Sequence, residues 1–302
     1  MSGRIHDRSH FFKYASRETA LRVIETKSFR WSSPTKFNDP FDHQTGFVLD
    51  IEPERFANLL TASSERLIFG DVEVRANPPS LLTQLALRFR SIRDRLPRQK
   101  ILEELRQASF EVAQRMQEQI GEFNAILLEH LCHSRVFCVS ELHDNVVMWS
   151  HYAEEHRGVV FKLGCDDQLD NTLLAARKVH YTDRFLSFPN AETYTKHLTG
   201  EEPFDLLPLI WQIAFTKHAD WSYEREWRVH IPLLHEPAGD GYTIYKENPR
   251  VFEAIYLGCR MPHEDVTRVV NSVRQYLPNT RVFQGERSNR SFSLEFKDLY
   301  AP

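Results

Sequence analysis

Two glutamates lie two residues apart in the segment 221–228, WSYEREWR, among aromatic and arginine side chains. Residues 227–232 look strand-like, and side chains at i and i+2 of a strand share a face, so Glu224 and Glu226 are predicted to project together. Paired like charges beside aromatic surface shift pKa values and suit acid–base or cation-stabilising chemistry. The same octapeptide is also typical of an exposed edge strand that carries Glu–Arg pairs.

Two further segments combine polar, aromatic and glycine residues outside any clean amphipathic period. One joins Lys13-Tyr14 with the turn NDPFD at 38–42, and the other runs from 145 to 158 and includes MWSHYAEEHRG. Buried polar groups need partners. We therefore expect one pocket lined by Asn38, Asp39, His151, Glu224 and Glu226. The alternatives are a plain turn at 38–40 and, for His151, a hydrogen-bonded pocket histidine without a functional role.

Other kinds of site are disfavoured by spacing. His151 and His156 are five residues apart, unlike the i, i+4 pair of HExxH zinc sites, so no metal is predicted. Isolated glycines give no phosphate-binding loop. Trp149 and Trp227 are most simply large core residues.

These segments resemble a family of bacterial domains of unknown function. The resemblance rests on Lys13-Tyr14, NDPFD at 38–42, MWSHYAEEHRG at 148–158 and WSYEREWR at 221–228, which occur in the family's order. It covers most of the chain outside residues 52–134. It implies family membership and no particular activity.

A second, weaker resemblance is to ADP-ribosyltransferases. Such enzymes have a polar residue on a first strand, then a helix like that carrying Leu21 and Ile24, a strand ending in an aromatic–Ser element, and a catalytic Glu within E-x-E on a late strand. Lys13, with His10 nearby, stands where many of them carry His or Arg. The resemblance implies that NAD is the substrate.

The resemblance also implies roles for residues. Glu226 would stabilise the oxocarbenium-like cation formed when the nicotinamide–ribose bond breaks, and Glu224 would orient or deprotonate the acceptor. The catalytic set is Glu226, Glu224 and His151. A further set of residues is expected to hold NAD by ring stacking, by hydrogen bonding or by contacts from arginine to the pyrophosphate. These residues are Lys13, Tyr14, Trp31, Ser32, Asn38, Asp39, Phe41, Arg157 and Arg228.

The predicted function is therefore an ADP-ribosyltransferase-like effector or toxin of anti-phage defence that modifies nucleic acid or protein. One alternative is a non-catalytic nucleotide-sensing or scaffold module. Another is a hydrolase with Glu226 or His151 as general base. The expected partners are NAD or a related nucleotide and the modified target.

The helices and strands that position these residues are expected to form an α+β fold with a mixed, mostly antiparallel sheet, as in ADP-ribosyltransferases. Residues 10–302 are expected to form one domain, into which residues 52–134 insert as a helical segment, with helical periodicity over 81–96 and 101–131. This segment is either a structural excursion or an arm for homo-oligomerisation or a partner protein. Strands are predicted near 10–14, 29–32, 136–140, 159–163, 178–181, 252–257, 280–283 and 291–296, and helices near 17–27, 204–215 and 264–276.

The composition limits which partners and which cellular compartment are expected for this protein. A net charge of −4 and a pI near 6.4 disfavour bulk nucleic-acid binding, although they leave room for a local basic patch. The four cysteines have no CxxC spacing and are typical of reduced thiols. No apolar run approaches the length of a membrane span and no signal peptide is recognisable, so a cytoplasmic protein is predicted.

Overall fold

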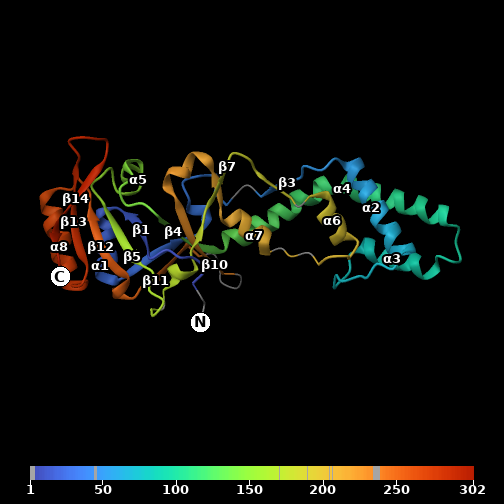
Figure 1. Cartoon of the computed structure of the whole chain (residues 1–302), viewed down its shortest axis with the longest axis horizontal. Helices are drawn as coiled ribbons and strands as arrows, with labels where there is room; N and C mark the ends of the chain where they lie inside the picture. Colours follow the sequence, from blue (N-terminus) through green and yellow to red (C-terminus); the bar gives the residue numbers. More distant parts are fainter. Residues whose placement is uncertain are drawn as a thin grey trace. The chain divides into compact units, whose positions relative to one another are not determined.

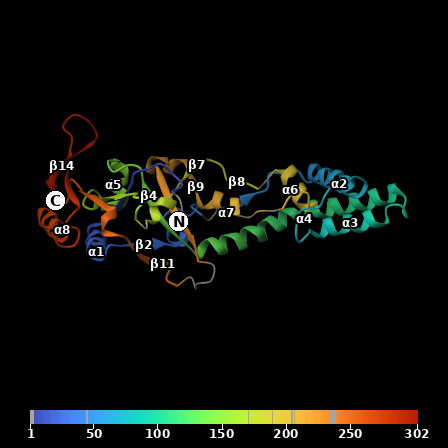
Figure 2. The ribbon, with the colours of Figure 1, turned by 60° about the horizontal axis from the view of Figure 1, so that its bottom comes forward.

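A computed structural model describes residues 4–43, 46–169, 171–188, 190–203, 205, 207–233 and 239–302 (Figures 1 and 2). Its contacts group the chain into two compact units. Unit 1 consists of Met1–Gln44, His130–Asp183 and Ala214–Pro302, and unit 2 consists of Thr45–Glu129 and Arg184–Ile213. The single-domain interpretation with an insertion at 52–134 stays a prediction.

Unit 1 is built on a ten-stranded sheet. Its main path runs β11-β2-β4-β1-β5-β12-β13-β14, and β10 pairs with β4 and β6. Every pairing in it is antiparallel except β12 with β13. The predicted mixed, mostly antiparallel α+β fold is thus confirmed. The strands are β1 (His10–Ala15), β2 (Ser28–Ser32), β4 (Ser134–Ser140), β5 (Val159–Gly164), β6 (Arg177–Lys178), β10 (Glu226–Pro232), β11 (Tyr242–Lys246), β12 (Phe252–Leu257), β13 (Arg281–Arg287) and β14 (Leu294–Tyr300).

Strand β4 is the branch point of this sheet. One of its edges pairs with β10 over its whole length, from Glu226 opposite Ser140 to Pro232 opposite Ser134. Its other edge meets β1 at Ser140 and β2 at Val136. The start of β10, the end of β4 and the middle of β1 are therefore neighbours. A separate parallel pair, β7 (His180–Thr182) and β9 (Thr216–His218), also belongs to unit 1.

Helices cover both faces of the sheet (Figure 1). Helices α1 (Arg17–Thr26) and α8 (His263–Tyr276) pack on each other and on one face. Helix α1 begins where the Ser16 side chain accepts a hydrogen bond from the Thr19 amide, and it ends at Lys27 in a left-handed conformation. Helix α5 (Val146–Tyr152) packs on the other face against Phe12 and Tyr14.

The main core is rich in aromatic side chains. Trp31 is fully buried, and its ring stacks on Phe137 with centroids 5.3 Å apart. Phe29 packs on Phe161 and Phe252 in the same cluster. Burial of this kind stabilises a fold by roughly 1.5–3 kcal/mol per large side chain. Trp31 therefore serves the core and not a cofactor, which corrects its predicted binding role.

Short 3₁₀ helices join strands in the described part of unit 1. They are η1 (Pro34–Lys36), η2 (Thr172–Ala175), η3 (Ala219–Glu224) and η4 (Pro249–Val251).

Unit 2 is mainly helical. Its apolar cluster holds Leu67 and Ile68, with Ala86, Ile101 and Leu105 from the following helices. The Asn124 side chain accepts from the Phe47 amide at 2.9 Å and donates to the Phe47 carbonyl at 2.7 Å. The remaining elements of the chain are α2 (Pro53–Phe69), α3 (Leu81–Ile92), α4 (Arg98–Cys132), α6 (Ala191–Leu198), α7 (Leu207–Ala214) and the strands β3 (Phe47–Val48) and β8 (Leu186–Ser187).

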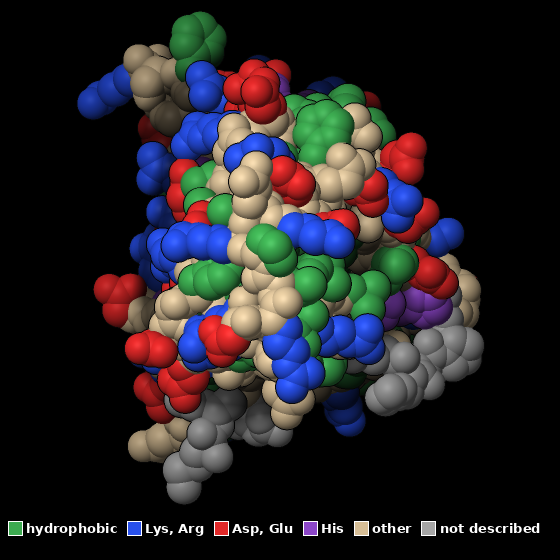
Figure 3. Space-filling view, turned by 90° about the vertical axis from the view of Figure 1, so that its right-hand side faces the viewer, with side chains coloured by type: hydrophobic (Ala, Val, Ile, Leu, Met, Phe, Trp, Pro, Cys, Tyr) green, Lys and Arg blue, Asp and Glu red, His purple; other side chains and the backbone are tan. Residues whose placement is uncertain are grey.

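Charges of both signs are interspersed on the face drawn in Figure 3. Surface ion pairs such as Arg98 with Glu65 at 2.6 Å and Arg55 with Glu192 at 2.9 Å each contribute about 0–1 kcal/mol to stability. Among the residues that the structure describes, no helix combines the length and the apolar character that crossing a membrane requires.

Candidate active site

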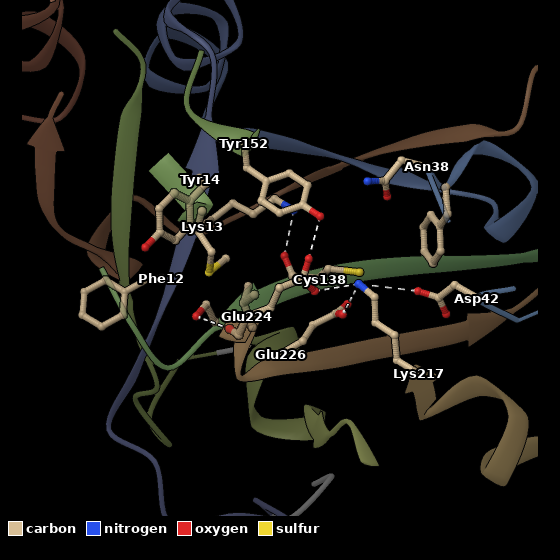
Figure 4. A pocket seen from close by; sticks show the side chains of 14 residues that line it. Phe12, Lys13, Tyr14, Asn38, Asp42, Cys138, Tyr152, Lys217, Glu224 and Glu226 are labelled. Atoms are coloured by element: carbon tan, nitrogen blue, oxygen red, sulfur yellow. Dashed lines mark hydrogen bonds and ion pairs between the residues drawn. The ribbon is translucent and has the colours of Figure 1, made fainter. Parts of the chain in front are cut away.

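A cavity of about 170 Å³ lies in unit 1 where β1, β4 and β10 meet (Figure 4). A volume of this order accepts one ring-sized group, since a cavity of about 150 Å³ holds benzene. Its lining combines aromatic rings with five acidic or basic side chains. The lining residues are Phe12, Lys13, Tyr14, Phe37, Asn38, Asp42, Cys138, Val139, Ser140, Met148, Tyr152, Lys217, Glu224 and Glu226.

Lys217, on β9, joins the two glutamates. Its Nζ donates to Glu224 Oε2 at 2.6 Å and to Glu226 Oε2 at 3.0 Å, and it lies 3.7 Å from an Asp42 oxygen. All four side chains are buried. A buried ammonium that holds two carboxylates together lowers their mutual repulsion and fixes their positions.

The convergence of Glu224 and Glu226 has a different local cause from the one predicted. Glu224 is the last residue of η3, Arg225 is left-handed with φ of 43°, and Glu226 is the first residue of β10. The two glutamates are therefore not alternate residues of one strand. The turn at Arg225 and the shared Lys217 bring the carboxylates together, and strand periodicity was the wrong reason.

Arg228 lies behind Glu226 and is completely buried. Its NH1 and NH2 groups donate to the two oxygens of Asp42 at 2.8 and 2.6 Å, and its Nε donates to Glu226 Oε1 at 2.7 Å. NH1 also donates to the carbonyl of Ala214 at 3.0 Å. The predicted pyrophosphate contact is corrected, because these bonds occupy the guanidinium and it does not line the cavity.

The two glutamates have opposite pKa shifts. Burial, reinforced by the negative charge of Glu226, raises the pKa of Glu224 to about 7. Burial also opposes ionisation of Glu226, yet the cations Arg228 and Lys217 hold its pKa well below the usual range. At neutral pH one carboxyl group can exchange a proton while its neighbour stays ionised. Paired carboxyl groups divide acid–base work in this way.

Tyr152 and Lys13 complete the polar wall. The Tyr152 hydroxyl donates to Glu224 Oε1 at 2.6 Å, and burial raises the pKa of Tyr152. Lys13 Nζ donates to the Cys138 carbonyl at 2.7 Å, and burial lowers the pKa of Lys13. Tyr14 lines the cavity by its ring, while its hydroxyl donates to the Leu142 carbonyl at 3.0 Å. Lys13 is thus an amine that loses its proton more readily than an exposed lysine.

Of the five residues expected in one pocket, Asn38, Glu224 and Glu226 line the cavity, while Asp39 and His151 do not. Asp39 is buried, and its Oδ1 accepts from the Phe41 amide at 2.9 Å, so it closes its own turn as the alternative interpretation required. His151 is exposed and shares a hydrogen bond of 3.1 Å with the Tyr223 hydroxyl. It lies outside the cavity that its neighbour Tyr152 enters.

Three other predicted binding residues also lie outside this lining. Phe41 is 59% exposed, and Ser32 pairs with Val136 and Tyr242 in the sheet. Arg157 is bound to Glu155 at 2.9 Å. Phe41 and Arg157 lie at the surface and Ser32 is paired within the sheet, so none of the three lines the cavity.

Sequence reasoning missed Asp42, Cys138, Tyr152 and Lys217 as individual site residues. Two of them carried a usable signal, because Asp42 ends the NDPFD turn and Tyr152 follows Met148 by four residues on α5. An i, i+4 pair shares a helix face, and both side chains line the cavity. Lys217 precedes the double-glutamate segment and has no motif of its own. Within the described part of the chain, no group of three His, Cys, Asp or Glu side chains is arranged to hold a metal ion.

Comparison with known protein families gives a match to part of the chain. A family model described as "Protein of unknown function (DUF2971)" matches residues 148–229, which include α5, Lys217 and both glutamates. No curated protein matches the chain. No solved structure matches it.

Proposed function

We propose that the cavity of unit 1 is the active site of an ADP-ribosyltransferase-like enzyme that cleaves the nicotinamide–ribose bond of NAD. The observation that carries this proposal is the pair of buried glutamates on one ammonium, Glu224 with a pKa of about 7 and Glu226 ionised. N-glycosidic cleavage requires a fixed negative charge near a developing cation and a second group that moves a proton.

In the proposed reaction the C1′–N bond breaks and the nicotinamide leaves as a neutral molecule. The ionised Glu226 stabilises the oxocarbenium-like ribose by its negative charge. The acceptor then forms a bond to C1′ through oxygen or nitrogen, and its proton passes to Glu224 in the ionised form. Water as acceptor gives hydrolysis, and a hydroxyl or base nitrogen of the target gives ADP-ribosyl transfer.

The cavity dimensions limit how NAD would bind. About 170 Å³ suits one ring, so the nicotinamide or the adjoining ribose would enter and the rest of the dinucleotide would lie outside. The rings of Phe12, Tyr14 and Phe37 supply flat surfaces in the cavity that the two glutamates also line. Asn38 offers an amide that can pair with the nicotinamide carboxamide or a ribose hydroxyl.

The test is NAD turnover, measured as nicotinamide release, by wild type, Glu224→Gln and Glu226→Gln. We expect each variant to lose about two to four orders of magnitude in turnover, with NAD affinity changed far less. The matched control is Glu155→Gln, which removes an exposed carboxylate of the same unit. Glu226→Gln leaves two buried cations less compensated, so its thermal unfolding must be compared with that of Glu224→Gln.

The outcomes separate the candidate functions. The proposal is supported if the wild type releases nicotinamide and a folded Glu224→Gln variant does not. NAD binding without nicotinamide release, unaltered by either variant, replaces it by the non-catalytic nucleotide-binding module. Absence of both binding and release overturns both.

A further inference from the structure

A second hollow of unit 1 also includes a residue of α5 in its lining. It is a groove of about 1000 Å³ between the segment around Arg260 and the β13–β14 connection. Helix α5 and the turn after it contribute to both sites: Met148 and Tyr152 line the cavity, while Val146 and His156 line the groove. The groove is lined by Val146, His156, Cys259, Arg260, Gly285, Glu286, Arg287, Ser288, Asn289, Arg290, Ser291, Phe292, Ser293 and Leu294.

Three exposed arginines, Arg260, Arg287 and Arg290, line this groove. Within the described residues, none of their guanidinium groups forms an ion pair with a carboxylate. Many other surface arginines do, for example Arg281 with Asp298 at 2.7 Å and Arg157 with Glu155 at 2.9 Å. The single carboxylate of the lining, Glu286, is ion-paired with Lys297. The groove is therefore a local positive surface on a chain whose net charge is −4.

Two of the three arginines, Arg260 and Arg287, lie near His156 or Cys259 in the groove. The charge of Arg260 helps to lower the pKa of His156, after the larger effect of burial. Burial raises the pKa of Cys259, and the charges of Arg287 and Arg260 oppose that rise. The Sγ atom of Cys259 lies 3.9 Å from His156 Nδ1. This part of the groove is held in place by backbone hydrogen bonds, because the Arg260 amide donates to the His156 carbonyl at 2.9 Å and the Gly258 amide donates to the Gly158 carbonyl at 3.0 Å.

An aromatic ring stands at the edge of the groove. The β13–β14 connection projects from the sheet (Figures 1 and 2) and is closed by a hydrogen bond from the Ser288 amide to the Ser293 carbonyl at 3.0 Å. Phe292 in this loop is completely exposed. Burying such a ring would be favourable, so its exposure beside arginines points to a ligand with flat faces and negative charge.

We infer that this groove binds single-stranded nucleic acid, with Arg260, Arg287 and Arg290 on phosphates and Phe292 stacked on a base. Guanidinium groups bind phosphates bidentately, and base stacking on an exposed ring requires bases that are free of a duplex. A phosphopeptide would use the charges and leave Phe292 without a partner. If the proposed function holds, single-stranded nucleic acid is the class of acceptor that receives ADP-ribose, because a strand in this groove lies one helix away from the cavity. The binding itself does not depend on NAD cleavage.

The experiment measures fluorescence anisotropy of a labelled oligothymidylate with the full chain, without NAD, over a range of salt concentrations. We expect the triple variant Arg260→Gln, Arg287→Gln, Arg290→Gln to bind at least about tenfold more weakly. Its salt dependence should be shallower, by about 0.7 in the logarithmic slope for each phosphate that is no longer neutralised. Phe292→Ala should weaken binding by about tenfold, and Phe292→Trp should restore it.

Arg268→Gln is the matched control, because Arg268 is an exposed arginine of α8 outside the groove. Equal binding by wild type and the triple variant, or an equal loss in Arg268→Gln, overturns the inference. The inference is also overturned if duplex DNA or a phosphopeptide binds as tightly as the single strand and Phe292→Ala does not affect that binding. Oligonucleotide binding is measured without NAD, so it can persist where nicotinamide release fails, and the failure of each proposal leaves a distinct result.

Discussion

Asp42 and Arg228 form a completely buried, bidentate ion pair between residues 186 positions apart in sequence. The pair ties the NDPFD turn to the middle of β10. Because Arg228 also binds Glu226, the geometry of the candidate site depends on this tertiary contact.

Arg228→Met tests how much this ion pair contributes to the free energy of unfolding. Removing the guanidinium leaves Asp42 and Glu226 buried, with Lys217 near both of them and His43 hydrogen-bonded to Asp42 at 2.8 Å. Breaking a buried pair in this way costs about 3–5 kcal/mol. Chemical denaturation should show a decrease of that size in the free energy of unfolding. Arg281→Met is the control, because Arg281 pairs with Asp298 at the surface and should cost about 0–1 kcal/mol. Equal decreases in the two variants would show that the buried pair has no special role.

Glu224 should make the protein less stable as the pH rises from about 4.5 to 7. The unfolded chain releases this proton near 4.5, whereas the folded chain holds it to about 7, so the contribution is present below 4.5 and is lost as the pH rises through 7. Glu224→Gln should therefore gain stability relative to wild type over this interval, by about 3 kcal/mol at most. Thermal unfolding at successive pH values measures the difference.

Glu226→Gln should affect the opposite side of the pH scale. The lowered pKa of Glu226 gives stability that is present above about 4.5 and is lost as the pH falls below that value. The variant should show a weaker acid-side decrease in stability than wild type. If both glutamine variants had the same pH profile, the two glutamates would not have distinct protonation states.

Gly158 is required by a close approach of two chain segments. A Cβ there would meet the Ala15 carbonyl oxygen at 2.2 Å and the Ala153 backbone at 2.8 Å. Gly158→Ala should therefore destabilise unit 1 by several kcal/mol or prevent folding, since no backbone atom can move away cheaply. Gly121→Ala, in the middle of α4 with no atom near the new Cβ, should instead stabilise by about 0.5–1 kcal/mol. Denaturant melts of both variants give the comparison.

Asn145 joins the start of α5 to the segment that carries Glu224. Its Oδ1 accepts from the Val147 and Met148 amides at 3.0 Å, and its Nδ2 donates to the Tyr223 carbonyl at 3.0 Å. Asn145→Ala should cost about 1–2 kcal/mol because it removes the helix cap. Asn145→Asp keeps the cap and removes the donor, so its unfolding should change less. A fall in nicotinamide release by Asn145→Asp would assign the Tyr223 contact a positioning role.

The amino-acid sequence determined the secondary elements and the segments that carry the site. Strand propensity over 227–232 and helical patterns near 17–27 and 264–276 are local properties, and the predicted elements have their counterparts in β10, α1 and α8. The break in amphipathic period likewise located Lys13, Tyr14, Asn38 and both glutamates, all of which line the cavity.

Only the tertiary structure decided which members of those segments face inward. Within α5 a rotation of about 100° per residue turns His151 to solvent and Tyr152 to Glu224. Lys217 joins the site because β9 brings it to the two glutamates, and Arg228 is occupied because Asp42 reaches it from a distant turn. Contacts of this kind depend on distances in the folded chain, and spacing in sequence does not encode them.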